Sequence, residues 1–317
     1  MANTKSNNKI KFKRYVILFF LLIFAYIVSL ILTCMIPRSK VVSNIEKSRV
    51  SILQQGINKP LLFNSNAYIL DTFSDGIMIN MSYAVESSKP IKSALEGNQQ
   101  ILRNSANVSE NLTNLFSDSI TTNWSYGRYW HGWMVVIRPL LVFFDYSEIR
   151  YLNIIFMTLL LIIFLGMVYK YIGIKAEFSF ILGFLLVNFW IVPLCLHYSS
   201  VFYLALIFGI ILILLRNKPH IFGLCFFTVG SMTCFFDLLS APMVTLGVCL
   251  VLTLLACIGF IPMIWYVIIG NHSQVHTRFT YRALISTIVS YIYISFVLID
   301  KNPLIYLYKK FTRNKNI

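Results

Sequence analysis

Long apolar runs alternate with short basic turns along most of the chain. The first run, about 15–36, follows a basic N-terminus, and others lie at about 151–169, 178–197, 200–215 and 220–238. A helix needs about 20 apolar residues to cross the roughly 30 Å of hydrocarbon in a bilayer. The pattern therefore predicts an all-α, multi-pass protein of the plasma (cytoplasmic) membrane, with the lipid bilayer as its first partner.

Two later runs, 243–269 and about 283–299, bring the prediction to about seven transmembrane helices. Lys and Arg mark the turns expected to face the cytoplasm, and both the N-terminus and the 301–317 tail are basic. Two cytoplasmic ends require an even number of crossings, so a count of seven leaves the tail on the wrong side.

A bend in the 243–269 run would make the number of crossings even and leave both ends of the chain in the cytoplasm. Gly259 and Pro262 lie within it, and the run is too short for two full crossings, so we expect a re-entrant hairpin there. The polar stretch 270–282 then faces outside. The alternative is a single straight crossing, which makes that stretch a cytoplasmic loop.

A polar segment, about 37–129, separates the first two runs and is expected outside the cell, because the N-terminus before the first helix is basic. Residues 129–146 are apolar, but Arg138 and Pro139 interrupt them and aromatic residues flank them, which favours an interfacial helix over a crossing. The predicted organisation is a basic cytoplasmic tail and first helix (1–36), an extracytoplasmic segment with interfacial helices (37–150), a transmembrane bundle (151–300) and a basic tail (301–317).

Composition agrees with this interpretation and excludes others. Hydrophobic residues make up 57% of the chain, charged residues only 12%, and the mean hydropathy is +0.72, which excludes an ordinary soluble enzyme. The net charge of +15 comes from Lys and Arg at the ends of apolar runs, so we expect no nucleic-acid partner. The six cysteines all lie in apolar runs and form neither a disulfide framework nor a CxxC metal site.

Three acids are candidates for chemistry. Asp71 and Asp75, in "LDTFSDGIMIN", are four residues apart and would share one face of a helix, where a carboxylate acts as general base or metal ligand. Two solvated loop acids are the alternative. Asp237 lies in the apolar C-terminal half, where a carboxylate marks either function or a pairing between helices.

The 270–282 stretch is rich in hydrogen-bonding groups. His272 and His276 have a spacing that permits joint metal ligation on a helix, and Arg278 and Arg282 suit a phosphate or pyrophosphate. The arginines could equally anchor an inner membrane face.

The order of one helix, a long first external segment bearing acids, an interfacial aromatic helix and a helical bundle resembles the GT-C class of integral-membrane glycosyltransferases. Three stretches also resemble a group of bacterial multi-pass proteins associated with that class: "YGRYWHGWMVVIRPLLVFFDYSEIRYLN", "FFDLLSAPMVTLG" and "WYVIIGNHSQVHTRFTYR". GT-C enzymes usually have more helices, so this chain would be a shortened member.

The resemblance implies transfer of a glycosyl unit from a polyprenyl-phosphate-linked donor to a cell-surface glycan, with either no cofactor or a divalent cation. It places the catalytic acid at Asp75 or Asp71. The candidates for binding substrate or carrier phosphate are Arg128, His131, Arg138, Asp237, His272, His276, Arg278 and Arg282. A non-catalytic membrane protein, either a polysaccharide-export partner or an inactive shortened relative, is the alternative.

Overall fold

The computed structural model describes residues 2–62, 68–102, 107–117, 122–125, 127, 130–218, 221–237, 244–245 and 247–249. Of these residues 76% are helical, as the apolar runs predict. Among the described residues, three helices are long and apolar enough to cross a membrane: the Lys13–Cys34 part of α1 (Ala2–Cys34), α7 (Tyr146–Tyr171) and α9 (Leu196–Leu214). The chain thus has the helices of a membrane protein.

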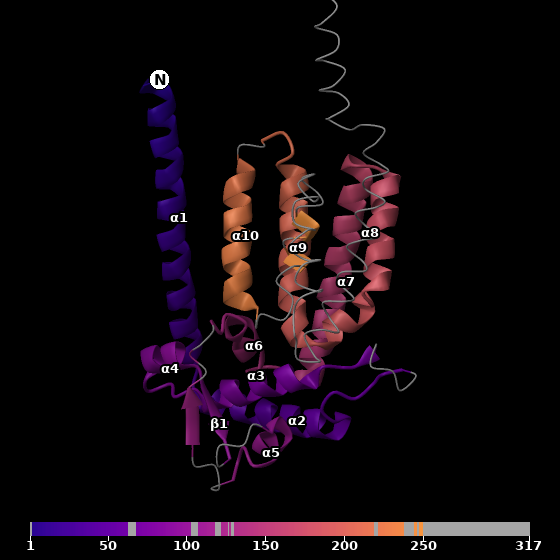
Figure 1. Ribbon diagram of the computed structural model, residues 1–317. Helices are drawn as coiled ribbons and strands as arrows, with labels where there is room; N and C mark the ends of the chain where they lie inside the picture. Colours follow the sequence, from indigo (N-terminus) through magenta and orange to yellow (C-terminus); the bar gives the residue numbers. More distant parts are fainter. Residues whose placement is uncertain are drawn as a thin grey trace, which may run out of the picture.

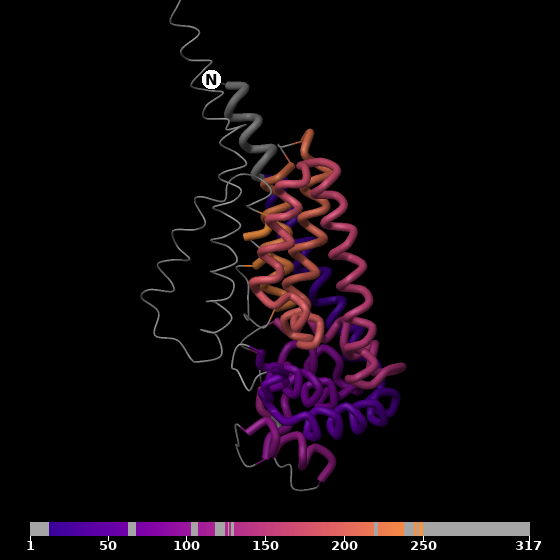
Figure 2. The backbone as a smooth tube through the Cα atoms, turned by 90° about the vertical axis from the view of Figure 1, so that its right-hand side faces the viewer, coloured from indigo at the N-terminus to yellow at the C-terminus, as the bar shows by residue number. Residues whose placement is uncertain are grey.

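Two shorter helices, α8 (Ile174–Leu186) and α10 (Phe222–Phe236), complete a bundle with the three long ones. Both views show the bundle helices running side by side, with a separate helical domain at one end (Figures 1 and 2). The amino end of α1 lies at the opposite end of the bundle, as does the turn between α9 and α10 that carries Arg216 and Lys218. Basic residues therefore gather at the end away from the domain.

The domain at the end of the bundle, residues 38–141, is called the head domain below. Its elements are α2 (Arg38–Gln55), α3 (Thr72–Ala84), α4 (Pro90–Glu96), β1 (Asn98–Ile101), α5 (Val108–Thr113), β2 (Thr122–Ser125) and α6 (Met134–Leu140). The strands β1 and β2 pair antiparallel, a feature that the all-α prediction missed. Its core includes Ile45, Met78 and Leu112, all buried, and it continues onto Tyr146 at the start of α7.

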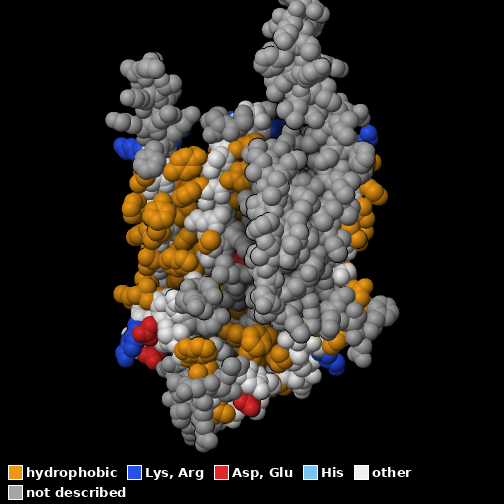
Figure 3. Space-filling model, viewed as in Figure 1, with side chains coloured by type: hydrophobic (Ala, Val, Ile, Leu, Met, Phe, Trp, Pro, Cys, Tyr) orange, Lys and Arg blue, Asp and Glu red, His pale blue; other side chains and the backbone are white. Residues whose placement is uncertain are grey.

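The surface has the distribution expected of a protein that spans a membrane. On the face shown in Figure 3, hydrophobic side chains cover α1 between its ends, and charged side chains gather towards those ends. Phe20 and Phe24 on α1 are 64% and 68% exposed, which is costly in water and favourable in lipid.

Two predicted segments differ in detail from the structure. The run at 178–197 is broken, because Asn188 adopts a left-handed φ of 53° and a 3₁₀ turn, η2 (Phe189–Leu194), follows it. The next helix, α9, therefore begins at Leu196 and not near residue 200. In the 129–146 segment the helix α6 is short, and its Arg138 is buried in the protein.

The predictions for the 243–269 hairpin, for residues 270–282 and for the 301–317 tail concern residues outside the described part of the chain, apart from a few positions before 250. The helix α10 ends at Phe236, close to the head domain.

The carboxyl end of α10 contacts the head domain at Gly132. The Gly132 N–H donates to the Phe235 carbonyl at 2.9 Å, and a Cβ on Gly132 would lie 2.4 Å from both that oxygen and the Phe235 ring. The Phe235 ring also stacks on Tyr26 of α1, with centroids 4.0 Å apart. Close backbone approach thus joins α1, α10 and the loop before α6.

We expect Gly132→Ala to destabilise the protein by about 1–3 kcal/mol, because the added methyl must push α10 away from the head domain. The control is Gly230→Ala, in α10 itself, where a Cβ would meet nothing within 4 Å. That change should be neutral or slightly stabilising. Thermal unfolding in detergent measures both, and equal midpoints for the two variants would contradict the close contact.

Candidate functional site

The Asp75 carboxylate is fully buried and accepts hydrogen bonds from two other helices. Its Oδ2 accepts from the Leu196 amide at 3.0 Å and from the Tyr146 hydroxyl at 2.8 Å. Its Oδ1 lies 3.1 Å from both the His197 amide and the His197 Nδ1. The first amides of α9 have no partner within their own helix, so Asp75 supplies the cap that Cys195 does not.

Asp71 lies one helical turn before Asp75 and faces the same histidine. Its Oδ2 is 3.4 Å from His197 Nε2 and 3.3 Å from the Tyr198 hydroxyl. The two carboxylates therefore share one face, as their spacing predicts. Burial alone would raise the pKa of the Asp71 carboxyl, but the His197 ring, the Ser74 amide and the Tyr198 hydroxyl together hold it below its ordinary value.

The acid cluster continues to a cation at the start of α7. The Arg150 guanidinium lies 4.9 Å from the centre of the Tyr146 ring, whose hydroxyl donates to Asp75. Arg150 Nη1 donates to Gln55 Oε1 at 2.7 Å. The negative charge of two buried acids thus has His197 on one side and Arg150 behind Tyr146 on another.

Arg138, a predicted phosphate ligand, is fully buried and contacts backbone carbonyls. Its Nη1 donates to the Ser82 carbonyl, and its Nη2 donates to the Ile36 carbonyl at 2.7 Å. These carbonyls lie at the carboxyl ends of α3 and α1, where helix dipoles favour a cation. Burial lowers the pKa of Arg138 to about 10, with smaller effects from Cys34 and Arg38. In this position Arg138 joins two helices and does not face solvent.

The other predicted ligands fall into two groups. His131 and Asp237 are buried on either side of the contact between Gly132 and Phe235, so the structure brings "YWHGW" and "FFD" together. Burial lowers the pKa of His131 to about 4, which keeps its ring neutral at pH 7. Arg128, His272, His276, Arg278 and Arg282 lie outside the described residues.

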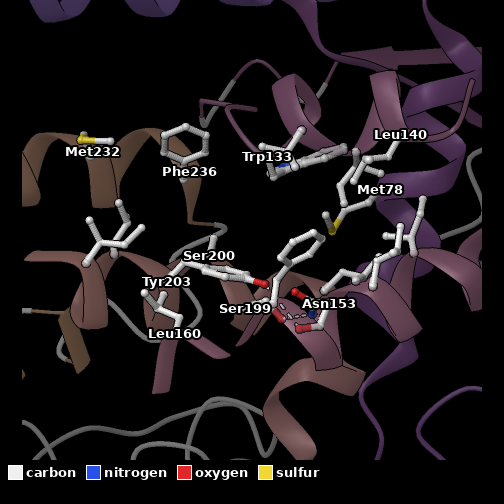
Figure 4. A pocket seen from close by; sticks show the side chains of 18 of the residues that line it. Met78, Trp133, Leu140, Asn153, Leu160, Ser199, Ser200, Tyr203, Met232 and Phe236 are labelled. Carbon is white, nitrogen blue, oxygen red and sulfur yellow. Dashed lines mark hydrogen bonds between the residues drawn. The ribbon is translucent and has the colours of Figure 1, made fainter. Parts of the chain in front are cut away.

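A cavity of about 830 Å³ lies between the head domain and the membrane-spanning helices. Figure 4 shows Met232 and Phe236 of α10 on one side of it, Trp133 and Met78 of the head domain on another, and Tyr203, Ser199 and Asn153 facing them. Its volume lies in the range of cavities that bind small molecules.

The lining of this cavity is mainly hydrocarbon. The Asn153 amide nitrogen donates to the Pro193 carbonyl at 2.8 Å and to Ser199 Oγ at 2.7 Å, so the polar groups deep in the cavity bind one another. Phe156, Leu159 and Ile163 on α7 are 58%, 52% and 55% exposed, which leaves that wall open to the side. An apolar cavity with such a wall suits a hydrocarbon ligand better than a polar one.

One polar group at the head-domain end of the cavity has no internal partner. The Trp133 side chain is 3% exposed, and its Nε1 has no hydrogen-bond partner among the described residues. An indole N–H buried without an acceptor is costly. A ligand oxygen at this end of the cavity would satisfy it.

Neither Asp71 nor Asp75 is among the described residues that line this cavity. Leu196 lines it and also binds Asp75 through its amide, so the acid cluster lies directly behind that part of the wall. Within the described part of the chain, no group of three or more His, Cys, Asp or Glu side chains is placed to hold a metal ion.

Comparison of the chain with family models, with curated proteins and with solved structures finds no match.

Sequence reasoning did not identify His197, Tyr146 or Arg150. A single histidine in an apolar run was the available signal for His197, because ionisable groups in such runs are costly. Tyr146 and Arg150 stand four apart at the start of a capped helix, and nothing in the local sequence indicates that Tyr146 contacts a carboxylate 71 positions earlier or that Arg150 packs on its ring.

We expect Asp75→Asn to reduce the free energy of unfolding by about 3 kcal/mol or more, because one amide oxygen cannot accept from all the donors around it. The control is Glu86→Gln, an exposed head-domain acid whose pair with Lys89 spans 3.8 Å and should contribute little. Chemical unfolding in detergent compares the two. Equal stabilities would exclude Asp75 as a structural link between helices.

Asp71 should make the free energy of unfolding depend on pH in the acid range. Because its pKa in the folded protein is below the ordinary 3.8, Asp71 contributes stability above about pH 4, and that contribution is lost as the pH falls through the folded-state pKa. Asp71→Asn should therefore lose less stability than the parent between pH 7 and pH 3. Unfolding midpoints of the parent and the variant at both pH values measure this difference. Equal losses of stability in the two proteins would argue against a lowered pKa of Asp71.

Proposed function

We propose that the chain transfers a glycosyl unit from a polyprenyl-phosphate-linked donor to a cell-surface glycan on the outer face of the membrane. The observation that carries the proposal is the apolar cavity that opens sideways at α7. An isoprenoid chain has no hydrogen-bonding groups and matches a wall of Leu, Ile, Met and Phe side chains.

The ends of the cavity fit the two parts of such a donor. The hydrocarbon enters along Phe156 and Ile163, and the phosphate end lies towards the head domain, near the unpartnered Trp133 N–H. Asp237 follows Phe236, which lines the cavity, so it is the acid nearest in sequence to the lining on α10. The basic end of the bundle is cytoplasmic in this proposal, which places the head domain outside.

Asp71 is the better candidate for the catalytic base. Asp75 is fully buried and occupied by donors from α7 and α9, whereas the Asp71 side chain is 8% exposed and contacts His197 and Tyr198 only through side chains. A general base contributes about 10²-fold or more to a rate. Asp71→Asn is therefore the cleaner test of catalysis, because Asp75→Asn also weakens the fold.

One observation favours the second candidate, a non-catalytic membrane protein such as a polysaccharide-export partner or a shortened inactive relative. The two acids of α3 lie behind the wall of the cavity and not in its lining. A protein of this class would bind the lipid chain without transferring its sugar.

Filling the cavity should abolish lipid binding. Ile207→Trp introduces a large ring at a lining position of α9, and it should weaken binding of a polyprenyl phosphate at least 10-fold. The control is Leu214→Trp on the same helix, 56% exposed and not among the lining residues. Binding is measured on purified protein in detergent, with unfolding midpoints to confirm that both variants fold.

Equal affinities in parent and Ile207→Trp would contradict the cavity as the lipid site. A second arm separates the two candidates. Transfer of labelled sugar from a lipid-linked donor in membranes should occur with the parent and fall at least about 100-fold in Asp71→Asn, with lipid binding retained. Lipid binding without any transfer by the parent would leave the non-catalytic candidate.

A further inference from the structure

A second cavity lies on the opposite face of α7. It has a volume of about 440 Å³ and is lined by Gln55, Lys59, Pro60, Leu61, Leu70, Ser147, Arg150, Tyr151, Ile154 and Leu194. Successive α7 residues turn by about 100°, so Ser147 and Tyr151 face almost directly away from Ile149 and Phe156, which line the first cavity. The two cavities are separate sites.

The charge in this cavity is positive. Lys59 is exposed at its edge, whereas Arg150 is only 8% exposed. Arg150 Nη1 is held by Gln55, but its Nε has no hydrogen-bond partner among the described residues. The guanidinium is therefore fixed in place by Gln55 and the Tyr146 ring while one of its buried donors is left for a ligand.

The surroundings place this cavity at a membrane surface. It lies beside the first turns of α7, where Tyr151 is 69% exposed, and Leu61 beside it is 39% exposed. Pro60 and Leu61 on the opposite wall belong to a short antiparallel bridge, in which Pro60 pairs with Ile69 and the Leu61 amide donates to the Tyr68 carbonyl at 2.8 Å. Tyr68 packs near Trp190, which is 44% exposed. Exposed Tyr and Trp side chains concentrate at the level of lipid headgroups.

We propose that this cavity binds the phosphate of an anionic glycerophospholipid. Arg150 and Lys59 receive the phosphate, and the acyl chains extend along the apolar side of Tyr151, Ile154 and Leu194. A free phosphate ion would use the same two cations but would gain nothing from that apolar wall. The bound headgroup joins α2, the segment at Lys59–Leu61 and α7 at the point where Arg150 packs on Tyr146. This site is independent of the first cavity and of the proposed glycosyl transfer.

The test uses the full chain in lipid nanodiscs or detergent. The parent, extracted from vesicles containing equal phosphatidylglycerol and phosphatidylcholine, should retain phosphatidylglycerol preferentially when bound lipids are counted by native mass spectrometry. Arg150→Gln should reduce that retention about 10-fold, and Lys59→Gln severalfold. The matched control is Lys92→Gln, an exposed head-domain lysine whose pair with Glu96 spans 3.8 Å, which should leave retention unchanged.

The outcomes separate the possible explanations. Because Arg150 packs on Tyr146, its variant is scored only where the unfolding midpoint shows a folded protein, and the exposed Lys59 provides the test if it does not. Equal retention in the parent and Lys59→Gln overturns the proposal, as does a parent without preference for the anionic lipid. Displacement of the lipid by millimolar inorganic phosphate would show a free-phosphate site and would also overturn it. Loss of polyprenyl-phosphate binding in Ile207→Trp has no bearing on this result.

Discussion

The Asp75 carboxylate is the constraint on which the described arrangement depends. A carboxylate with no exposure to solvent is tolerated only where hydrogen bonds replace its water, and here every donor comes from a distant part of the chain. The Leu196 and His197 amides come from α9, and the Tyr146 hydroxyl comes from α7. Moving either helix by one residue would leave donors and acceptor unpaired, so α3 fixes the relative positions of both.

That constraint also shapes the two cavities. Leu196 presents its amide to Asp75 and its side chain to the large apolar cavity, and Met78, one turn after Asp75, lines the same space. Tyr146 presents its hydroxyl to Asp75 and its ring to Arg150, which lines the smaller cavity on the other face of α7. The same buried ion thus positions an apolar wall on one side and a cation on the other.

The helices and the shared face of Asp71 and Asp75 were predictable because they depend on local patterns, namely run length and a spacing of four. Their partner, His197, was not, because it is 122 positions from Asp75 and its contact exists only once α3 packs across the start of α9. The break at Asn188 and the inward turn of Arg138 were missed for the same reason. A left-handed asparagine or an arginine bound to two helix ends is stable only through tertiary contacts.

A buried donor without a partner at the wall of a cavity distinguishes the polar groups available to a ligand from the structural ones. Each Asp75 oxygen has protein donors, which suits a group that joins helices and leaves little capacity for a substrate. Trp133 and Arg150 each keep a buried nitrogen with no partner among the described residues, and each lines a cavity. Because a buried donor without an acceptor is costly, such positions persist where a ligand supplies the acceptor. Both nitrogens are donors, and the ligand groups that suit them best are oxygen-rich and anionic, as the phosphates of membrane lipids are.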